Sequence, residues 1–240
     1  MTLSPDEVRT VGFIGAGNIG SALARHFLRT GRQVVLSNSR GPQTLTELID
    51  ELGPAARAAT PAEAAAAGDV VVVTIPLKAY ASVPAEPLAG KVVLDTNNYH
   101  PQRDGQFAEL DNETTTSSEL LQQHLPAAFV VKAFNAIAAP HLAVDGRPRD
   151  DEHRRALPIA GDDRDAKDLV TSLTDEIEYD VVDAGLLAEG WRFQPGTWAY
   201  AVPLTVAELS DALARAKRRR DTTPEDEQEI ARRLEAAFNR

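Results

Sequence analysis

The chain has 240 residues, enough for one large domain or for one domain with a smaller partner, because domains most often contain about 100 to 150 residues. Hydrophobic residues make up 43% and charged residues 25% of the chain, which is typical of a globular protein and excludes disorder as its main character. The absence of cysteine excludes disulfide scaffolds, cysteine-based zinc sites and thiol nucleophiles. A net charge of -11 argues against nucleic-acid binding, which requires a basic face.

Neither a membrane span nor a secretion signal is indicated. Apolar runs such as residues 70–73 are only a few residues long, where a membrane helix needs about 20. The first ten residues, MTLSPDEVRT, are acidic and polar, whereas a secretion signal begins with a basic segment and an apolar run. We therefore expect a cytoplasmic protein without a membrane partner.

The first part of the chain alternates between short apolar segments and amphipathic segments. Apolar, β-branched runs predict strands, and apolar residues at helical spacing predict helices between them. The predicted strands are 9–14, 33–36, 70–76, 91–95 and 129–135, and the predicted helices are 21–30, 45–52, 61–67 and 117–125. Strands that alternate with helices require crossover connections, so residues 1–145 are predicted to form an α/β domain with a doubly wound parallel sheet.

A smaller α+β unit is predicted for residues 146–240. It follows a polar stretch at 145–155 that is typical of a surface connection. Strands are expected at 157–160 and 177–183, a helix at 166–173, and mainly helix after about residue 205. A last helix begins at Thr223 and Pro224, and its apolar stripe of Ile230, Leu234 and Phe238 should dock on another surface. We expect this unit to bind the acceptor or to form a dimer.

The sequence GAGNIG, residues 15–20, follows the first predicted strand and opens the first helix. In this context a GxGxxG motif indicates a Rossmann-type dinucleotide site. Gly15 permits the tight turn, Gly17 lets the backbone approach a pyrophosphate, and Gly20 allows the helix to pack close to the sheet. The alternative is a glycine-rich turn without a ligand.

The end of the second predicted strand indicates which dinucleotide binds. An NAD site would usually carry Asp or Glu there, but this chain has Ser37, Asn38, Ser39 and Arg40, and its next acid is Glu47. Hydroxyl and guanidinium groups can bind a 2'-phosphate, which a carboxylate would repel. This predicts NADP(H), unless Arg40 is only a solvated loop residue.

Three segments are expected to meet where the nicotinamide ring binds, beyond the carboxyl ends of the central strands. Pro76 and Leu77 can form an apolar wall for one face of the ring. Asn97, Asn98 and Asn135 can hold a carboxamide or an acceptor ring, although asparagines at strand ends are also common turn formers.

Other residues point to structural roles. The five histidines lack metal-site spacing, so no metal site is predicted, and His26 lies within the first helix. Asp162 and Asp163 precede a predicted helix and suit helix capping better than acid–base chemistry. Trp191 and Trp198 are aromatic residues that either bind the acceptor or anchor packing, with packing favoured.

Several segments together resemble the NADPH-dependent reductases of the deazaflavin coenzyme F420. They also resemble the NADPH-oxidising domain of the six-transmembrane epithelial antigen ferrireductases. The matching segments are GAGNIGSALA, SNSR, VVVTIPLKAY, VVKAFNAI, PIAGDDRDAKDLV and VDAGLL. Archaeal F420-dependent members carry a histidine where this chain has Asn135 and a lysine where it has Thr44.

This resemblance implies that Ser39 and Arg40 bind the 2'-phosphate, Ile75 and Pro76 line the nicotinamide, and hydride passes at Asn135 and Ile137. It also implies a homodimer. The expected cofactor-binding residues are Gly15, Gly17, Asn18, Ile19, Gly20, Ser37, Asn38, Ser39, Arg40, Ile75, Pro76, Leu77, Asn97 and Ala133, and the hydride-transfer pocket contains Asn135 and Ile137.

The leading hypothesis is therefore an oxidoreductase that moves hydride between NADP(H) and coenzyme F420, mainly by positioning two planar rings. One alternative is an NADPH-dependent reductase of another acceptor, such as a flavin, an imine or a carbonyl compound. Such imine and carbonyl reductases need a proton donor, and none stands out by spacing. The other alternative is a non-catalytic NADP sensor.

Overall fold

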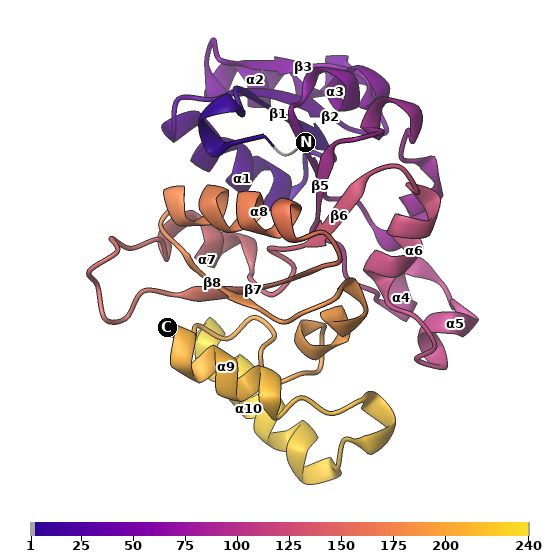
Figure 1. Cartoon of the computed structure of the whole chain (residues 1–240), viewed down its shortest axis with the longest axis vertical. Helices are drawn as coiled ribbons and strands as arrows, with labels where there is room; N and C mark the ends of the chain where they lie inside the picture. The colour runs from indigo at the N-terminus through magenta and orange to yellow at the C-terminus, as the bar shows by residue number, and fades with distance from the viewer. Residues whose placement is uncertain (1–2, 240) are drawn as a thin grey trace.

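A computed structural model describes residues 3–239 of the chain. Its centre is a sheet with the strand order β3-β2-β1-β4-β5-β6-β7-β8 (Figure 1). All pairings are parallel except that between β6 and β7. The strands are β1 (Thr10–Ile14), β2 (Gln33–Ser37), β3 (Ala56–Ala58), β4 (Val70–Val73), β5 (Val92–Asp95), β6 (Phe129–Lys132), β7 (Ala156–Gly161) and β8 (Asp180–Asp183). The order of the first six strands is that of a Rossmann fold, which confirms the predicted fold class.

The helices lie on both faces of the sheet (Figure 1). They are α1 (Asn18–Arg29), α2 (Thr46–Leu52), α3 (Pro61–Ala67), α4 (Pro101–Asp104), α5 (Ala108–Asp111), α6 (Ser117–His124), α7 (Ala139–Val144), α8 (Arg164–Glu176), α9 (Val206–Ala214) and α10 (Pro224–Phe238). A 3-10 segment, η5 (Leu187–Phe193), follows β8.

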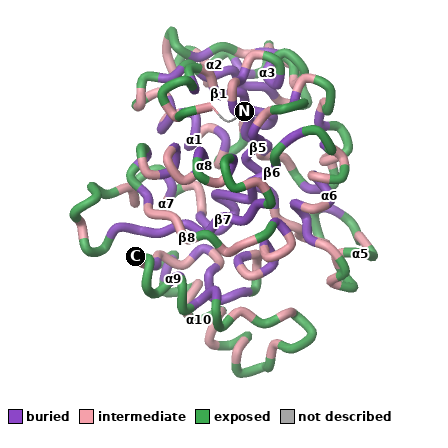
Figure 2. The backbone as a smooth tube through the Cα atoms, viewed as in Figure 1, coloured by how far each residue is buried: buried purple, intermediate pink, exposed green. Residues whose placement is uncertain are grey.

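Strand β4 shows why the sheet needs cover on both faces. Val70 and Val72 belong to an apolar cluster with residues of α1, α7 and α8, whereas Val71 and Val73 belong to a second cluster with residues of α3 and α6. All four side chains are fully buried, as expected for a continuous apolar strand in a parallel sheet. Figure 2 shows this burial following the central strands, while the backbone around α10 is mostly exposed or half-buried.

The residues after 145 extend the same sheet through β7 and β8. One side of β7 places Leu157 and Ile159 in the cluster that includes α8. Its other side places Ala156 and Ala160 in a third cluster with residues of α9 and η5, against which Ile230 of α10 packs. The predicted docking of the last helix is thus confirmed for Ile230. The division into domains at residue 145 stays a prediction.

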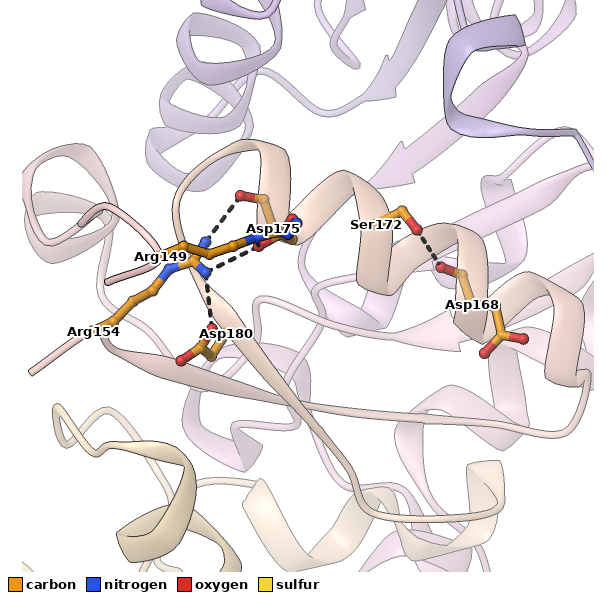
Figure 3. Close-up of polar contacts among 6 residues, drawn as sticks. All are labelled: Arg149, Arg154, Asp168, Ser172, Asp175 and Asp180. Carbon is orange, nitrogen blue, oxygen red and sulfur yellow. Dashed lines mark hydrogen bonds and ion pairs between the residues drawn. The ribbon is translucent and has the colours of Figure 1, made fainter. Parts of the chain in front are cut away.

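The connection at 145–155, predicted to lie on the surface, forms ion pairs through one buried and one exposed arginine. Arg154, whose side chain is only 3% exposed, donates to carboxylate oxygens of Asp175 and Asp180 over 2.9 Å each. Arg149 binds the same Asp175 carboxylate from the exposed side (Figure 3). These ion pairs attach the connection to α8, which contains Asp175, and to β8, which contains Asp180. They also provide the partners that a buried guanidinium requires. The predicted surface connection is thus confirmed for residues 145–153, which are exposed or half-buried, whereas Arg154 and Arg155 are buried.

Candidate functional site

The glycine loop lies at the point where the strand order reverses, between the carboxyl ends of β1 and β4. Gly15 has a φ of +110°, and a Cβ atom there would lie 2.1 Å from the carbonyl oxygen of Thr74. A Cβ atom on Gly20 would lie 2.6 Å from the Gly15 carbonyl oxygen. Both positions therefore require glycine to let the loop, α1 and the end of β4 approach each other.

Gly17 differs from these two glycines because the space beside it is open. A Cβ atom at Gly17 would meet no atom within 4 Å. Gly17 is also the N-cap of α1, and its position provides no side-chain cap for the first turn. Gly17 and Asn18 are exposed, and Ile19 is half-buried. The start of α1 thus presents backbone N–H groups and open space to an anion.

The first residues at the end of β2 shape the backbone. The Ser37 hydroxyl is buried and donates to the Phe13 carbonyl over 2.7 Å, so it is used within the sheet. The Asn38 amide donates to the Thr44 hydroxyl over 2.8 Å and accepts from the Arg40 N–H over 2.9 Å. Asn38 therefore forms an Asx turn that sets the course of the loop.

Ser39 and Arg40 are exposed at the tip of this loop. Within residues 3–239, the Arg40 guanidinium has no ion-pair or hydrogen-bond partner. The structure therefore places a hydroxyl and an uncompensated cation where an NAD site would carry an acid.

Hydrogen bonds join the three segments that the sequence expected to meet. The Ile75 N–H donates to Asn97 Oδ1 over 3.1 Å. Asn98 Nδ2 donates to the Asn135 carbonyl over 2.8 Å, and Asn135 Nδ2 donates back to Asn98 Oδ1 over 3.1 Å. Asn135 Nδ2 also donates to the Phe193 carbonyl over 3.0 Å, which brings η5 to the same place.

One polar atom of Asn97 and one of Asn135 remain without a partner. Among the described residues, the buried Asn97 Nδ2 has no acceptor and the buried Asn135 Oδ1 has no donor. Reversing either amide would break the hydrogen bonds to Ile75, Asn98 or Phe193, so the network determines both orientations. A free donor and a free acceptor are complementary to a primary carboxamide.

The apolar residues expected around the ring differ in accessibility. Pro76 is exposed and Ile75 is half-buried, so these two can form a wall. Leu77 is fully buried, and Ala133 and Ile137 are also buried. Ala133 and Ile137 belong to the main apolar cluster of the sheet.

A buried polar network beneath Asn97 was missed in the sequence, because its members are far apart in the chain and come together only in the fold. Lys132 Nζ donates to the Asn97 carbonyl over 3.1 Å, to Ser117 Oγ over 3.0 Å and to Ser118 Oγ over 3.2 Å. The Ser118 hydroxyl in turn donates to Asp95 Oδ2 over 2.6 Å, and Asp95 Oδ1 accepts from the Asn97 N–H over 3.0 Å.

Burial is the largest influence on both charged groups of this network. It lowers the pKa of Lys132 and raises the pKa of Asp95, while their mutual attraction opposes both shifts. The network therefore contains two titratable groups that are both displaced toward their neutral forms.

A cavity of about 500 Å³ adjoins this network and opens beside η5 and α10. Its wall includes aromatic, polar, basic and acidic side chains. Among its lining residues are Tyr99, His100, Ser117, Trp191, Gln194, Tyr200, Arg218 and Arg219. A wall of this composition suits a planar polar ligand.

Both tryptophans are packed against arginines. The Trp191 ring is contacted by Arg192 and Arg218, whose guanidinium carbons are 4.7 and 4.3 Å from the ring centroid. The guanidinium carbon of Arg215 lies 4.0 Å from the centroid of Trp198. Trp198 is a buried packing residue, as favoured in the sequence, whereas Trp191 both packs and lines the cavity.

Two predicted structural roles are confirmed. His26 is buried, with Nε2 2.6 Å from the Leu142 carbonyl oxygen. Asp163 caps α8 by accepting from the Ala166 N–H over 2.8 Å.

Across residues 3–239, no group of three or more His, Cys, Asp or Glu side chains is placed to hold a metal ion. No helix within that range is both long and apolar enough to cross a membrane.

Comparison with known proteins agrees with this architecture. The profile of the family "NADP oxidoreductase coenzyme F420-dependent" matches residues 10–99. A hypothetical protein from Sinorhizobium meliloti is 31% identical, with a TM-score of 0.71 over 83% of this chain and 96% of that protein. A protein from an Arthrobacter species, described as an F420-dependent NADP reductase, is 24% identical, with a TM-score of 0.63 over 75% and 85% of the two chains.

More distant structures share the fold. An imine reductase from Streptomyces aurantiacus is 21% identical, with a TM-score of 0.53 over 73% of this chain and 55% of that protein. Comparison with curated protein sequences gives no significant match.

The fold, the glycine loop and the family match together define an NADP-dependent oxidoreductase. The chain belongs to the family of coenzyme F420-dependent NADP oxidoreductases.

Proposed function

We propose that the chain transfers hydride between NADPH and a deazaflavin of the coenzyme F420 type. The observation that carries the NADPH side is the unpaired Arg40 guanidinium beside the exposed Ser39, at the end of β2. The description of the matched family supports the deazaflavin side, as do the aromatic side chains in the wall of the cavity beside η5.

The residues present suit the dinucleotide. The open space at Gly17 provides room for a pyrophosphate at the start of α1, and a Cβ atom would narrow it. The unpartnered Asn97 Nδ2 and Asn135 Oδ1 match the two polar groups of the nicotinamide carboxamide. NADPH, when bound, supplies the hydride. The task of the protein is then to hold two rings in contact and to exclude water.

The first experiment tests the acceptor. Purified protein is mixed with NADPH and oxidised coenzyme F420, and the visible deazaflavin band is followed. Bleaching that depends on NADPH is the expected result. If the protein reduces flavins, imines or carbonyl compounds but leaves F420 oxidised, the proposed acceptor is wrong. NADPH binding without turnover on any acceptor would indicate a sensor.

The second experiment tests the cofactor through the variant Arg40→Glu. Loss of a charge-assisted hydrogen bond should weaken NADPH binding by about 1.5 to 3 kcal/mol, which is about a 10- to 150-fold higher Kd. The affinity for NADH should change little, so the ratio of NADPH affinity to NADH affinity should decrease. Arg9→Glu is the matched control, because Arg9 is exposed and precedes β1, at the amino ends of the parallel strands, whereas Arg40 follows the carboxyl end of β2. If the ratio of the two affinities is unchanged in Arg40→Glu, the 2'-phosphate binds elsewhere.

A further inference from the structure

Lys132 has an unusual position for a lysine, since its side chain is among the largest fully buried ones in the protein. An ammonium group has three N–H donors, and Lys132 has three acceptors: the Asn97 carbonyl and the hydroxyls of Ser117 and Ser118. The ammonium is therefore fully hydrogen-bonded although it is shielded from water.

The two serine hydroxyls differ in where their own protons can go. Ser118 donates its hydroxyl proton to Asp95 Oδ2 over 2.6 Å. Ser117 accepts from Lys132, and in the described part of the chain no group accepts its hydroxyl proton. Ser117 also lines the cavity beside η5, whereas Ser118 is fully buried and does not. Ser117 thus separates the buried ammonium from the cavity.

This arrangement supplies what the proposed reaction still lacks. Hydride carries both electrons, so an acceptor ring that has received it must still gain one proton to become neutral. We propose that Ser117 gives this proton to the acceptor in the cavity and then receives a proton from Lys132. This proposal rests on the proposed function.

The step balances without a further reactant. The Ser117 O–H bond breaks as an N–H or O–H bond forms on the reduced acceptor, and an Nζ–H bond of Lys132 breaks as the Ser117 hydroxyl is restored. No group is oxidised or reduced by this transfer. Lys132 is left as a neutral amine and regains a proton from water through Ser117 once the product has left the cavity.

The surroundings of Lys132 favour such a transfer. Burial lowers its pKa, which makes the ammonium a better acid than an exposed lysine. Asp95 is the charged group that acts on it, from β5, and opposes this shift. From the η5 side Lys132 meets the backbone of Gly190, and the nearby Glu189 is bound by Arg192. The groups facing it from α6 are the uncharged Ser117 and Ser118.

The test uses variants of Ser117, because replacing Lys132 would leave Asp95 buried without its cation and confound the result with a folding defect. Ser117→Ala removes the proton route, and Ser117→Thr keeps a hydroxyl at the same place. Single-turnover reduction of F420 by NADPH is followed across a pH series in H₂O and in D₂O. General acid catalysis typically contributes at least 100-fold, so we expect Ser117→Ala to slow turnover by about 100-fold and Ser117→Thr to recover most of the rate.

The pH dependence separates a proton route from a structural role. The wild-type rate should fall as pH rises through the lowered pKa of Lys132, and it should be slower in D₂O. Ser117→Ala should lose both effects. An equal loss of rate in both Ser117 variants, or a Ser117→Ala rate and pH profile equal to those of the wild type, would overturn the proposal. Failure of the wild type to bleach F420 would instead refute the proposed acceptor.

A measurement without turnover tests Lys132, the group that is proposed to supply the proton to Ser117. The chain has five lysines, at 78, 91, 132, 167 and 217, so the side-chain signals of ¹³C-labelled lysine can be resolved by NMR in the full-length protein. The Lys132 signal should titrate below the ordinary lysine pKa of 10.5. A midpoint at or above that value would overturn the proposal, whatever the acceptor.

Discussion

Gly17→Ala should separate cofactor binding from folding. Gly17 has φ and ψ of -80° and -166°, extended values that alanine also adopts, and a Cβ atom there meets nothing within 4 Å. Replacing glycine with alanine where alanine can adopt the same conformation stabilises the folded state by about 0.4 to 1 kcal/mol, because the unfolded chain has less conformational entropy to lose. Alanine is a poorer N-cap than glycine by a similar amount, roughly 0.5 to 1 kcal/mol. These effects nearly cancel, so the free energy of unfolding should stay about the same.

The same methyl group should impair NADPH binding, because it occupies the open space in front of the first turn of α1. Loss of one backbone hydrogen bond to a charged phosphate weakens the binding free energy of NADPH by about 1.5 to 3 kcal/mol, which raises the Kd for NADPH by about 10- to 150-fold. NADPH binding is measured by calorimetry, and the free energy of unfolding by urea titration at constant m-value.

Gly15→Ala is the informative comparison. Its Cβ atom would lie 2.1 Å from the Thr74 carbonyl oxygen at a φ of +110°, so this variant should lose both stability and NADPH binding. The reasoning is refuted if Gly17→Ala is destabilised as strongly as Gly15→Ala. It is also refuted if Gly17→Ala folds normally and binds NADPH with wild-type affinity, since the pyrophosphate would then not approach Gly17.

Three further predictions concern the scaffold. Leu23 of α1 is fully buried, so Leu23→Ala should lower the free energy of unfolding by about 2 to 5 kcal/mol in urea titration, and a loss below 1 kcal/mol would mean that the core relaxes around it. Thr60→Ala removes the capping box of α3 and should cost about 1 kcal/mol in the same assay, whereas an unchanged midpoint would show that the cap is redundant. Hydrogen bonds from Lys217 and from the N–H and hydroxyl of Thr223 lower the pKa of Asp226 from 3.8 to about 2. The ionised Asp226 therefore contributes its full share to the free energy of unfolding above pH 3.8, and this share is lost as pH falls through about 2. A titration midpoint of the Asp226 carboxyl near 3.8, measured by ¹³C NMR, would contradict these contacts.

The strands and helices of the first part could be predicted because their signals are local. Apolar runs and helical spacing predict where elements lie, and the alternation of the two predicts a doubly wound sheet. The edge strand Ala56–Ala58 was missed because its Ala-Arg-Ala sequence lacks the β-branched residues typical of strands. The strand predicted for 70–76 ends at Val73, because the chain turns at Thr74 to meet the glycine loop.

The glycine loop and the loop after β2 could be located from the sequence for a similar reason, while their binding of a cofactor stays a prediction. The glycine loop and the residues after β2 carry their chemistry in consecutive positions. Neither the direction of β7 nor the buried partners of Lys132 could be predicted in this way. Lys132 ends one apolar strand and Asp95 another, and a charged residue at a strand end ordinarily marks exposure. Only the pairing of β5 with β6, and the packing of α6 over their ends, bury both.

The antiparallel pairing of β7 with β6 explains how residues after 145 reach the site. Lys132 pairs with Ala160 in this register, and the chain returns through β8 to η5. A Cβ atom on Gly190 of η5 would lie 2.7 Å from Lys132 Cδ, so η5 closes over the lysine stem only because this residue is glycine. The next residue, Trp191, lines the cavity. One short segment thus covers Lys132 and forms part of the cavity wall, so the proposed acceptor site and the burial of the ammonium depend on the same backbone.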